Sequence, residues 1–169
     1  MKKNSKAMLV SMAAFLVVFY GAKANSETNL LLDQIHKIEF NQCRTAAEQL
    51  ANILVDVDNH GYKIAWGPDN DDDILVSSVE NTWDDGSSSV ETGAVAPTTA
   101  GDCDGVRTRV LVANGSCSSV ANNWGAQRQG TLNSEWVHYE DDYSDYFMLS
   151  MGGSCVVKEV ERFVGLPMD

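Results

Sequence analysis

The predicted fold of this chain is decided by residues 27–55, which read ETNLLLDQIHKIEFNQCRTAAEQLANILV. Apolar side chains recur in this stretch mostly at spacings of three to five residues, which is typical of an amphipathic helix with one buried face. Ser26 or Thr28 can cap the start of such a helix, and the turn residues 58–61 can end it. We predict one long helix, whose buried face carries Leu31, Ile35, Ile38, Cys43, Ala46, Ala47, Leu50, Ile53 and Leu54.

Short β-type segments follow this helix, separated by Gly, Asn, Asp and Ser residues. Asn114-Gly115 has the residue types of a tight hairpin turn, so a hairpin is predicted from Val106 to about Val120. Further strands are predicted at 62–66, 74–79, 132–139 and 146–151, with a polar turn at 140–145.

Two other segments have no clear strand pattern. Residues 84–104 are rich in Gly, Ser, Thr and Asp, which predicts a long surface loop. Residues 154–164 favour a short helix, with a strand turn at Gly152-Gly153 as the alternative. The predicted class is α+β, with a long N-terminal amphipathic helix packed on an antiparallel sheet of four to five strands.

The first 24 residues have the pattern of a secretory signal peptide. Lys2, Lys3 and Lys6 precede an apolar stretch at 7–21, and Ala22-Lys23-Ala24 is a small-x-small cleavage site. We therefore predict that residues 1–24 are cleaved, that residues 25–169 form a single domain, and that the protein is periplasmic or secreted. The apolar stretch is shorter than the roughly 20 residues that a membrane-spanning helix needs, so no stable membrane insertion is expected after cleavage.

The chain is strongly acidic, with a formal net charge of −12 at pH 7. Cleavage after Ala24 would remove four basic residues and no acidic residue, which leaves a mature charge of −16. Such a charge repels nucleic acid and anionic lipid, and it favours cations or a basic protein as partner. The acidic residues gather between Lys63 and Arg107, a stretch that contains no basic residue.

All four cysteines follow the predicted leader, and an even number in an exported chain predicts two disulfides. The residues are Cys43, Cys103, Cys117 and Cys155. Three pairings are open from the sequence. We favour Cys103 with Cys117, which closes a short loop, and Cys43 with Cys155, which ties the first helix to the C-terminal region.

A candidate calcium site lies in one short acidic segment, because several carboxylate oxygens close together repel one another until a divalent cation binds. The residues are Asp69, Asp71, Asp72 and Asp73. The alternative is a solvated loop whose charges stay apart. His36, His60 and His138 are dispersed along the chain without partners at metal-ligand spacing, so no zinc site is expected.

Candidate partner-binding residues are tryptophans and aspartates in the most polar segments. Trp83 and Trp124 are the tryptophans expected to be exposed, and Asp84 and Asp85 follow Trp83 directly. Packing in the core or in a hairpin is the alternative role of such aromatic residues.

These patterns predict a non-enzymatic exported protein, of the inhibitor, immunity or assembly-accessory type, that binds a protein partner through the acidic surface of residues 69–104. No catalytic residue is predicted. One alternative is a pilin-like structural subunit of a surface fibre, because a hydrophobic N-terminus that runs into a long helix and then a β-region with a disulfide is similar in outline. Another is a calcium-stabilised carbohydrate-binding domain.

Overall fold

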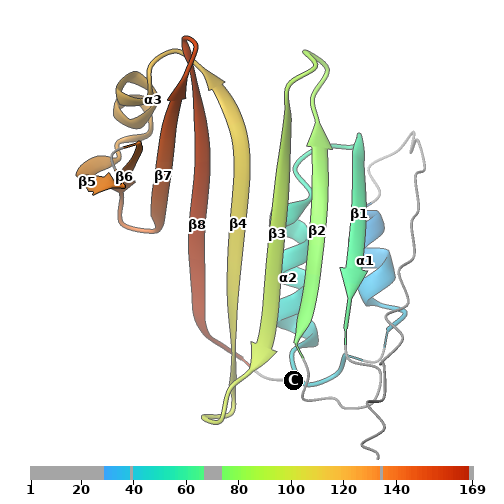
Figure 1. Ribbon diagram of the computed structural model, residues 1–169. Helices are drawn as coiled ribbons and strands as arrows, with labels where there is room; N and C mark the ends of the chain where they lie inside the picture. The colour runs from blue at the N-terminus through green and yellow to red at the C-terminus, as the bar shows by residue number, and fades with distance from the viewer. Residues whose placement is uncertain (1–28, 39, 67–73, 134, 168–169) are drawn as a thin grey trace, which may run out of the picture.

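Eight antiparallel strands form one sheet in the computed structural model of this chain, in the order β1-β2-β3-β4-β8-β7-β6-β5 (Figure 1). The structure describes residues 29–38, 40–66, 74–133 and 135–167. The fold is mostly β, which corrects the predicted α+β class with four to five strands. The elements are α1 (Leu30–Ile35), α2 (Arg44–Leu54), β1 (His60–Ala65), β2 (Leu75–Thr82), β3 (Ser88–Pro97), β4 (Asp102–Asn114), α3 (Cys117–Trp124), β5 (Gln127–Leu132), β6 (Trp136–Glu140), β7 (Ser144–Met151) and β8 (Ser154–Pro167).

The sheet consists of two meanders that meet at its centre. Strands β1 to β4 are neighbours in chain order, and so are β5 to β8. Helix α3 connects the two meanders, and the two longest strands, β4 and β8, pair antiparallel between them. Each meander has its own hydrophobic core, the first under α1 and α2 and the second under α3.

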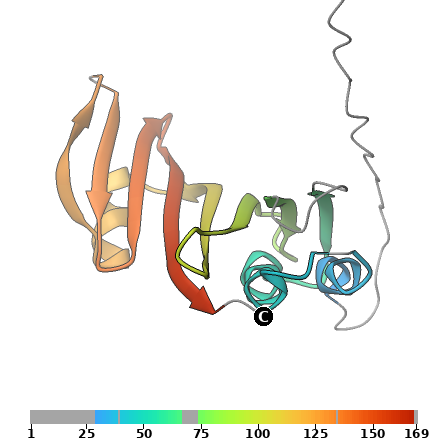
Figure 2. The same cartoon turned by 90° about the horizontal axis from the view of Figure 1, so that it is seen from below.

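Two short helices replace the predicted long helix. Helix α1 ends at Ile35, and α2 begins only at Arg44. Between them Ile38 and Phe40 are 5% and 2% exposed, and side chains two residues apart cannot share one face of a helix. A helix is about 10 Å wide and strands lie about 4.8 Å apart, so covering the first meander takes two helices side by side rather than one long helix (Figure 2).

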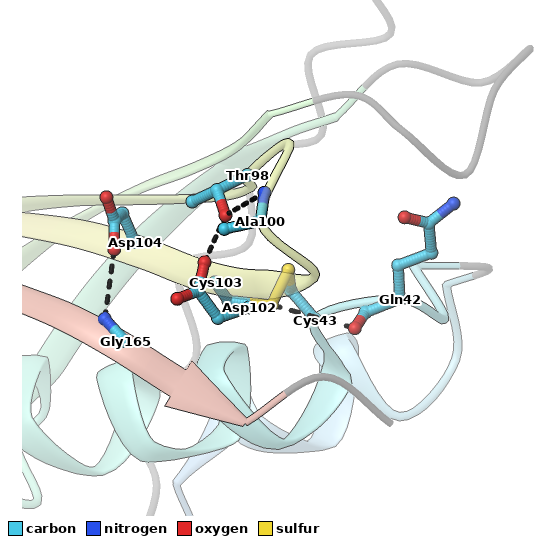
Figure 3. Close-up of a disulfide and its surroundings, with 8 residues drawn as sticks. All are labelled: Gln42, Cys43, Thr98, Ala100, Asp102, Cys103, Asp104 and Gly165. Atoms are coloured by element: carbon cyan, nitrogen blue, oxygen red, sulfur yellow. Dashed lines mark hydrogen bonds between the residues drawn. A yellow bond between two sulfur atoms is a disulfide. The ribbon is translucent and has the colours of Figure 1, made fainter.

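The two predicted disulfides are present, but the favoured pairing is wrong. Cys43 pairs with Cys103 and joins the start of α2 to the start of β4 (Figure 3), and Cys117 pairs with Cys155 and joins α3 to β8. Cys103 and Cys117 lie at opposite ends of β4, roughly 35 Å apart along an extended strand, so they cannot meet. Each meander therefore has one disulfide, which holds its helix against the sheet.

Three local predictions are also wrong because strand pairing is not local. Residues 84–104 form β3, its two turns and the start of β4 rather than a surface loop, and β3 pairs with β2 and β4. Asn114-Gly115 ends β4, whose partners are β3 and β8, and no hairpin to Val120 forms. The C-terminal segment is strand β8 rather than a helix, because Gly152 and Gly153, both at positive φ, turn β7 directly into it.

The remaining strand predictions vary in accuracy. The predicted strands at 62–66, 74–79 and 146–151 correspond to β1, β2 and β7, and the predicted turn at 140–145 connects β6 to β7. The predicted strand at 132–139 is instead the end of β5, a turn and most of β6. Residues 1–24 lie outside the described residues.

At Gly93 on β3, the α2 side chain of Leu50 packs closely against the sheet backbone. A Cβ atom built on Gly93 would lie 2.7 Å from both terminal carbons of Leu50 on α2. Replacing Gly93 by alanine would force the buried Leu50 side chain aside, since packed cores tolerate added atoms poorly.

We predict that Gly93→Ala lowers the free energy of unfolding by about 1–3 kcal/mol, as overpacking of a core does. Urea denaturation followed by circular dichroism measures the change. Gly61→Ala on β1 is the matched control, because a Cβ atom there meets nothing within 4 Å. Equal stability of the two variants would contradict the close approach of α2 at Gly93.

Candidate functional site

The two faces of the sheet differ sharply. Side chains alternate between the faces along each strand, and the disulfides and both cores lie on the face that carries the helices. The described helices leave the opposite face bare at the centre of the sheet. We call the bare centre the valine face, and it consists of Val90 on β3, Val106, Val110 and Val112 on β4, and Val156 and Val160 on β8.

The register of the strands gathers these valines into one patch. Val90 is paired with Val110, and Val112 with Val156. Exposed fractions are 54% for Val90, 43% for Val110 and 61% for Val112. The outward positions of an open antiparallel sheet are normally polar, so a cluster of half-exposed valines is an unusual feature of this face.

The polar groups within this patch are already hydrogen-bonded. The hydroxyls of Ser78 on β2 and Thr92 on β3 lie 3.1 Å apart and share a hydrogen bond, and the Thr108 hydroxyl donates to the Thr92 carbonyl oxygen at 3.4 Å. These hydroxyls therefore lose little when water is removed from the face. No charged side chain points outward from β3 between 90 and 96 or from β4 between 106 and 112.

Charged residues lie at the rim of the valine face and differ from side to side. On the β2 side, exposed Glu80 is paired with Val90, and the turn after β2 adds Asp84 and Asp85. On the β8 side, Lys158 lies between Val156 and Val160 as the partner of Val110, and Arg162 is the partner of Val106. The rim is thus acidic on one side and largely basic on the other, which would orient a partner.

An ionic network lies on the opposite, helix-bearing face, between the two hydrophobic cores. Glu91 on β3 is 0% exposed. The Arg107 Nη2 and Nε atoms lie 2.7 and 2.8 Å from one oxygen of Glu91, and Arg107 Nη1 lies 3.2 Å from Glu161 on β8. Arg109 Nε lies 3.4 Å from the second oxygen of Glu91.

Side chains from β2 and β3 complete the environment of Glu91. The Asn81 side-chain amide donates to Glu91 at 3.3 Å and to the Leu54 carbonyl oxygen at the end of α2 at 2.8 Å. The Ser89 hydroxyl also donates to Glu91. A buried carboxylate needs this many partners, because removal of a charge from water costs several kcal/mol. Glu91 therefore connects α2 to the pairing of β3 with β4.

Glu159 on β8 is a partly buried carboxyl beside the ionic network whose charge is incompletely compensated. Burial raises the pKa of the Glu159 carboxyl, and the charges of Arg107 and Arg109 offset the rise only in part. The Ser144 hydroxyl on β7 donates to Glu159 at 3.4 Å. A carboxyl whose pKa is raised in the folded protein costs stability once it ionises.

Tyr146 on β7 lies in the second core, on the side of the ionic network that faces the second meander. Its hydroxyl donates to the Asp141 carboxylate at 2.8 Å. Burial, together with this hydrogen bond, raises the pKa of Tyr146 to about 12. Burial opposes ionisation of Asp141, yet hydrogen bonds from the Tyr143 amide, the Tyr146 hydroxyl and the Ser144 amide hold its pKa below the ordinary value.

The structure separates the predicted partner-binding residues into two places. Trp83, Asp84 and Asp85 belong to the turn between β2 and β3, where the Arg109 guanidinium lies 5.7 Å from the centre of the Trp83 ring. Trp124 lies in α3, with its ring 5.5 Å from that of Tyr146. The turn and α3 lie on opposite sides of β4 (Figure 1). These residues therefore do not form one aromatic platform.

The predicted calcium ligands Asp69, Asp71, Asp72 and Asp73 lie outside the described residues. The four cysteines are all in disulfides, so the chain has no free thiol. The valine face was missed as a site, although its signal was present: Val106, Val110 and Val112 alternate with other residues along β4. Alternation shows that a strand has two faces, but it does not show which face the helices cover.

Comparison of the chain with models of protein families, with curated proteins and with solved structures finds no match in any of the three. Among the described residues, no helix has the length and apolar character needed to cross a bilayer. The two disulfides are typical of proteins in an oxidising extracellular or periplasmic compartment.

We predict that Glu91→Gln lowers the free energy of unfolding by about 3 kcal/mol, because it leaves Arg107 with a weakened partner in a buried place. Urea denaturation at pH 7 measures the loss. Glu80→Gln is the matched control, since Glu80 is exposed on the opposite face, and we expect it to change stability by less than about 0.5 kcal/mol. A loss below about 1 kcal/mol for Glu91→Gln would show that the network contributes little to stability.

Glu159→Gln should instead stabilise the protein near neutral pH. Because the folded-state pKa lies above the ordinary value of 4.5, the ionised carboxylate costs stability once the pH rises above that value. The variant should therefore gain stability relative to the natural chain between pH 4 and pH 7. Thermal unfolding of both proteins across this range measures the difference. If the stability of Glu159→Gln relative to the natural chain fell as the pH rises, the raised pKa of Glu159 would be contradicted.

Proposed function

We propose that this chain is an exported, non-enzymatic protein that binds a protein partner across the valine face. The observation that carries the proposal is an apolar patch that the described helices leave bare, with no outward charge on its β3 and β4 strands, on an otherwise strongly acidic chain. Depletion of charge at the centre with a polar rim is the usual composition of a protein interface.

The dimensions of the patch support a protein partner. Four neighbouring strands, β2, β3, β4 and β8, span roughly 15 Å, and six residues along β4 span roughly 20 Å. The resulting area of about 300 Å² falls at the lower end of the functional apolar patches on monomeric proteins. Contacts at the rim would enlarge it toward the roughly 800 Å² that each partner buries in a stable complex.

The charges define the chemistry of the partner. A net charge of −12 disfavours close approach of two copies of this chain and favours a partner of opposite charge. Asp84, Asp85 and Glu80 call for Lys or Arg on the partner where it meets the β2 side of the rim. The proposed partner is therefore a basic protein with an apolar centre, and this keeps the binding mode inferred from the sequence while moving its centre from the acidic segment to the sheet.

The alternative functions lack a supporting observation. The pilin-like outline depended on one long helix over residues 27–55, and the described part of this stretch contains the two short helices α1 and α2 instead. A carbohydrate-binding platform would place several exposed tryptophans together, but Trp124 is 39% exposed on α3, while Trp83 lies in the turn between β2 and β3 with the Arg109 guanidinium near its ring.

The direct experiment places a photo-crosslinking residue at Val110 in the protein as its own cells export it. We expect a single partner to be captured from Val110 and not from Asn123, which is exposed on α3 and belongs to the helix-bearing side. Capture of a second copy of the chain would contradict the basic partner, and equal capture from both positions would contradict the valine face.

With the captured partner purified, we predict that Val110→Lys weakens binding at least about 100-fold, since it places a second positive charge directly opposite Lys158 at the centre of an interface with a basic protein. Isothermal titration calorimetry measures the affinity. Ile53→Lys on α2 is the matched control, because Ile53 is an apolar residue of similar exposure on the other side. The double substitution Asp84→Asn and Asp85→Asn should slow association and reduce its dependence on salt.

A further inference from the structure

A cluster of one histidine and two carboxylates lies on the bare face, beside the valine face. His138 and Glu140 are two residues apart on β6, so both point to the same side of the sheet. Asp145 on β7 is the direct partner of Glu140. One ligand atom from each of the three residues lies within 4.8 Å of the others. We propose that these three side chains bind a zinc ion.

The side chains of this cluster are already oriented toward one another. The His138 Nε2 atom lies 2.8 Å from Asp145 Oδ1. The His138 ring stacks on Phe147, with ring centres 5.1 Å apart and planes 13° from parallel. Arg162 on β8 donates to the other carboxylate oxygen of Asp145 at 3.1 Å, which leaves Oδ1 directed at the histidine. The packing of Phe147 and the hydrogen bond of Arg162 thus hold two of the three ligands in place.

The distances suit a small divalent ion. Zinc binds imidazole nitrogen and carboxylate oxygen at about 2.0–2.2 Å, so two ligand atoms at a tetrahedral angle lie roughly 3.4 Å apart. The three atoms of this cluster need only small side-chain rotations to reach that spacing. Three protein ligands would leave the fourth position to water.

The charges favour a cation at this place. Glu140 and Asp145 lie directly opposite each other on neighbouring strands, and like charges in such a pair are destabilising. The turn between the strands adds Asp142, while Arg162, which pairs with Asp145, and Lys158 on β8 supply the nearby positive charges. An imidazole ligand selects zinc over calcium, which takes oxygen ligands almost exclusively. This site does not depend on the proposed partner.

The cluster of His138, Glu140 and Asp145 could not be recognised from the spacing of the histidines in the sequence. The histidines are dispersed in the chain, and the ligands come together only because β6 and β7 pair in a register that places Asp145 against Glu140. The remaining histidines differ in this respect. Among the described residues, His36 on the helix-bearing side has one acidic partner, Glu48 at 3.2 Å, so it makes an internal control.

The test is titration of zinc chloride into chelator-treated, disulfide-intact protein by isothermal titration calorimetry. We expect one zinc ion per chain, at least tenfold weaker binding in Glu140→Gln and in His138→Gln, and unchanged binding in His36→Gln. Glu140 is exposed, so Glu140→Gln keeps the fold even if His138→Gln loosens the β6–β7 pair. Cobalt(II) in place of zinc gives a second readout, since visible absorption bands of a four-coordinate ion should appear in the natural chain and be lost in both variants.

The proposal is overturned if the natural chain binds no zinc, or if Glu140→Gln and His138→Gln bind it as tightly as the natural chain does. Weaker binding in His36→Gln alone would place the ion at the His36–Glu48 pair and would equally overturn the assignment.

Discussion

The pairing of β4 with β8 is the interaction on which the rest of this structure depends. It joins two meanders, each with its own hydrophobic core and its own disulfide, into one sheet. Without it, the two longest strands would each expose an edge of unpaired backbone groups, which in water is prone to aggregation. Because its partners come from the middle and the end of the chain, this pairing requires most of the chain to be in place.

The ionic network connects strands at the centre of the sheet, where β4 pairs with β8. Arg107 reaches Glu91 on β3 and Glu161 on β8, so one side chain on β4 connects three neighbouring strands. The cores lie on either side of this network, and neither extends across it. Charged groups at this position cost desolvation energy, and a fully partnered carboxylate such as Glu91 keeps that cost acceptable. The raised pKa of Glu159 shows that the compensation is incomplete on β8.

At the centre of the sheet, between the two cores, charged residues lie on the inner face and valines on the outer face. This reverses the usual arrangement of an antiparallel sheet with one solvated face, in which polar residues face water. On β4, Arg107 and Arg109 point toward the helices while Val106, Val110 and Val112 point away from them. The proposed binding of a basic protein accounts for the bare valines and for the acidic β2 side of the rim. The proposed zinc site shares the outer face but relies on different residues, on β6 and β7.

The sequence by itself determined the features that depend on composition and on short-range pattern. These are the acidic charge, the presence of two disulfides, the strands corresponding to β1, β2 and β7, and the turn before β7. It also showed the alternation along β4, which is a local property of a strand. The candidate partner-binding residues were identifiable only as types, because exposure of a tryptophan depends on its neighbours in space.

Only the tertiary structure decided how these pieces combine. Two short helices form in place of the predicted long helix, because Ile38 and Phe40, which lie between α1 and α2, are both buried. Strand β3 lies inside the sheet although its inward residues include Glu91 and Gly93. Arginines on β4 neutralise Glu91, and the close packing of α2 requires a glycine at position 93. The disulfide pairing, the bare face and the His138 cluster likewise follow from strand register, and register depends on contacts between residues far apart in the chain.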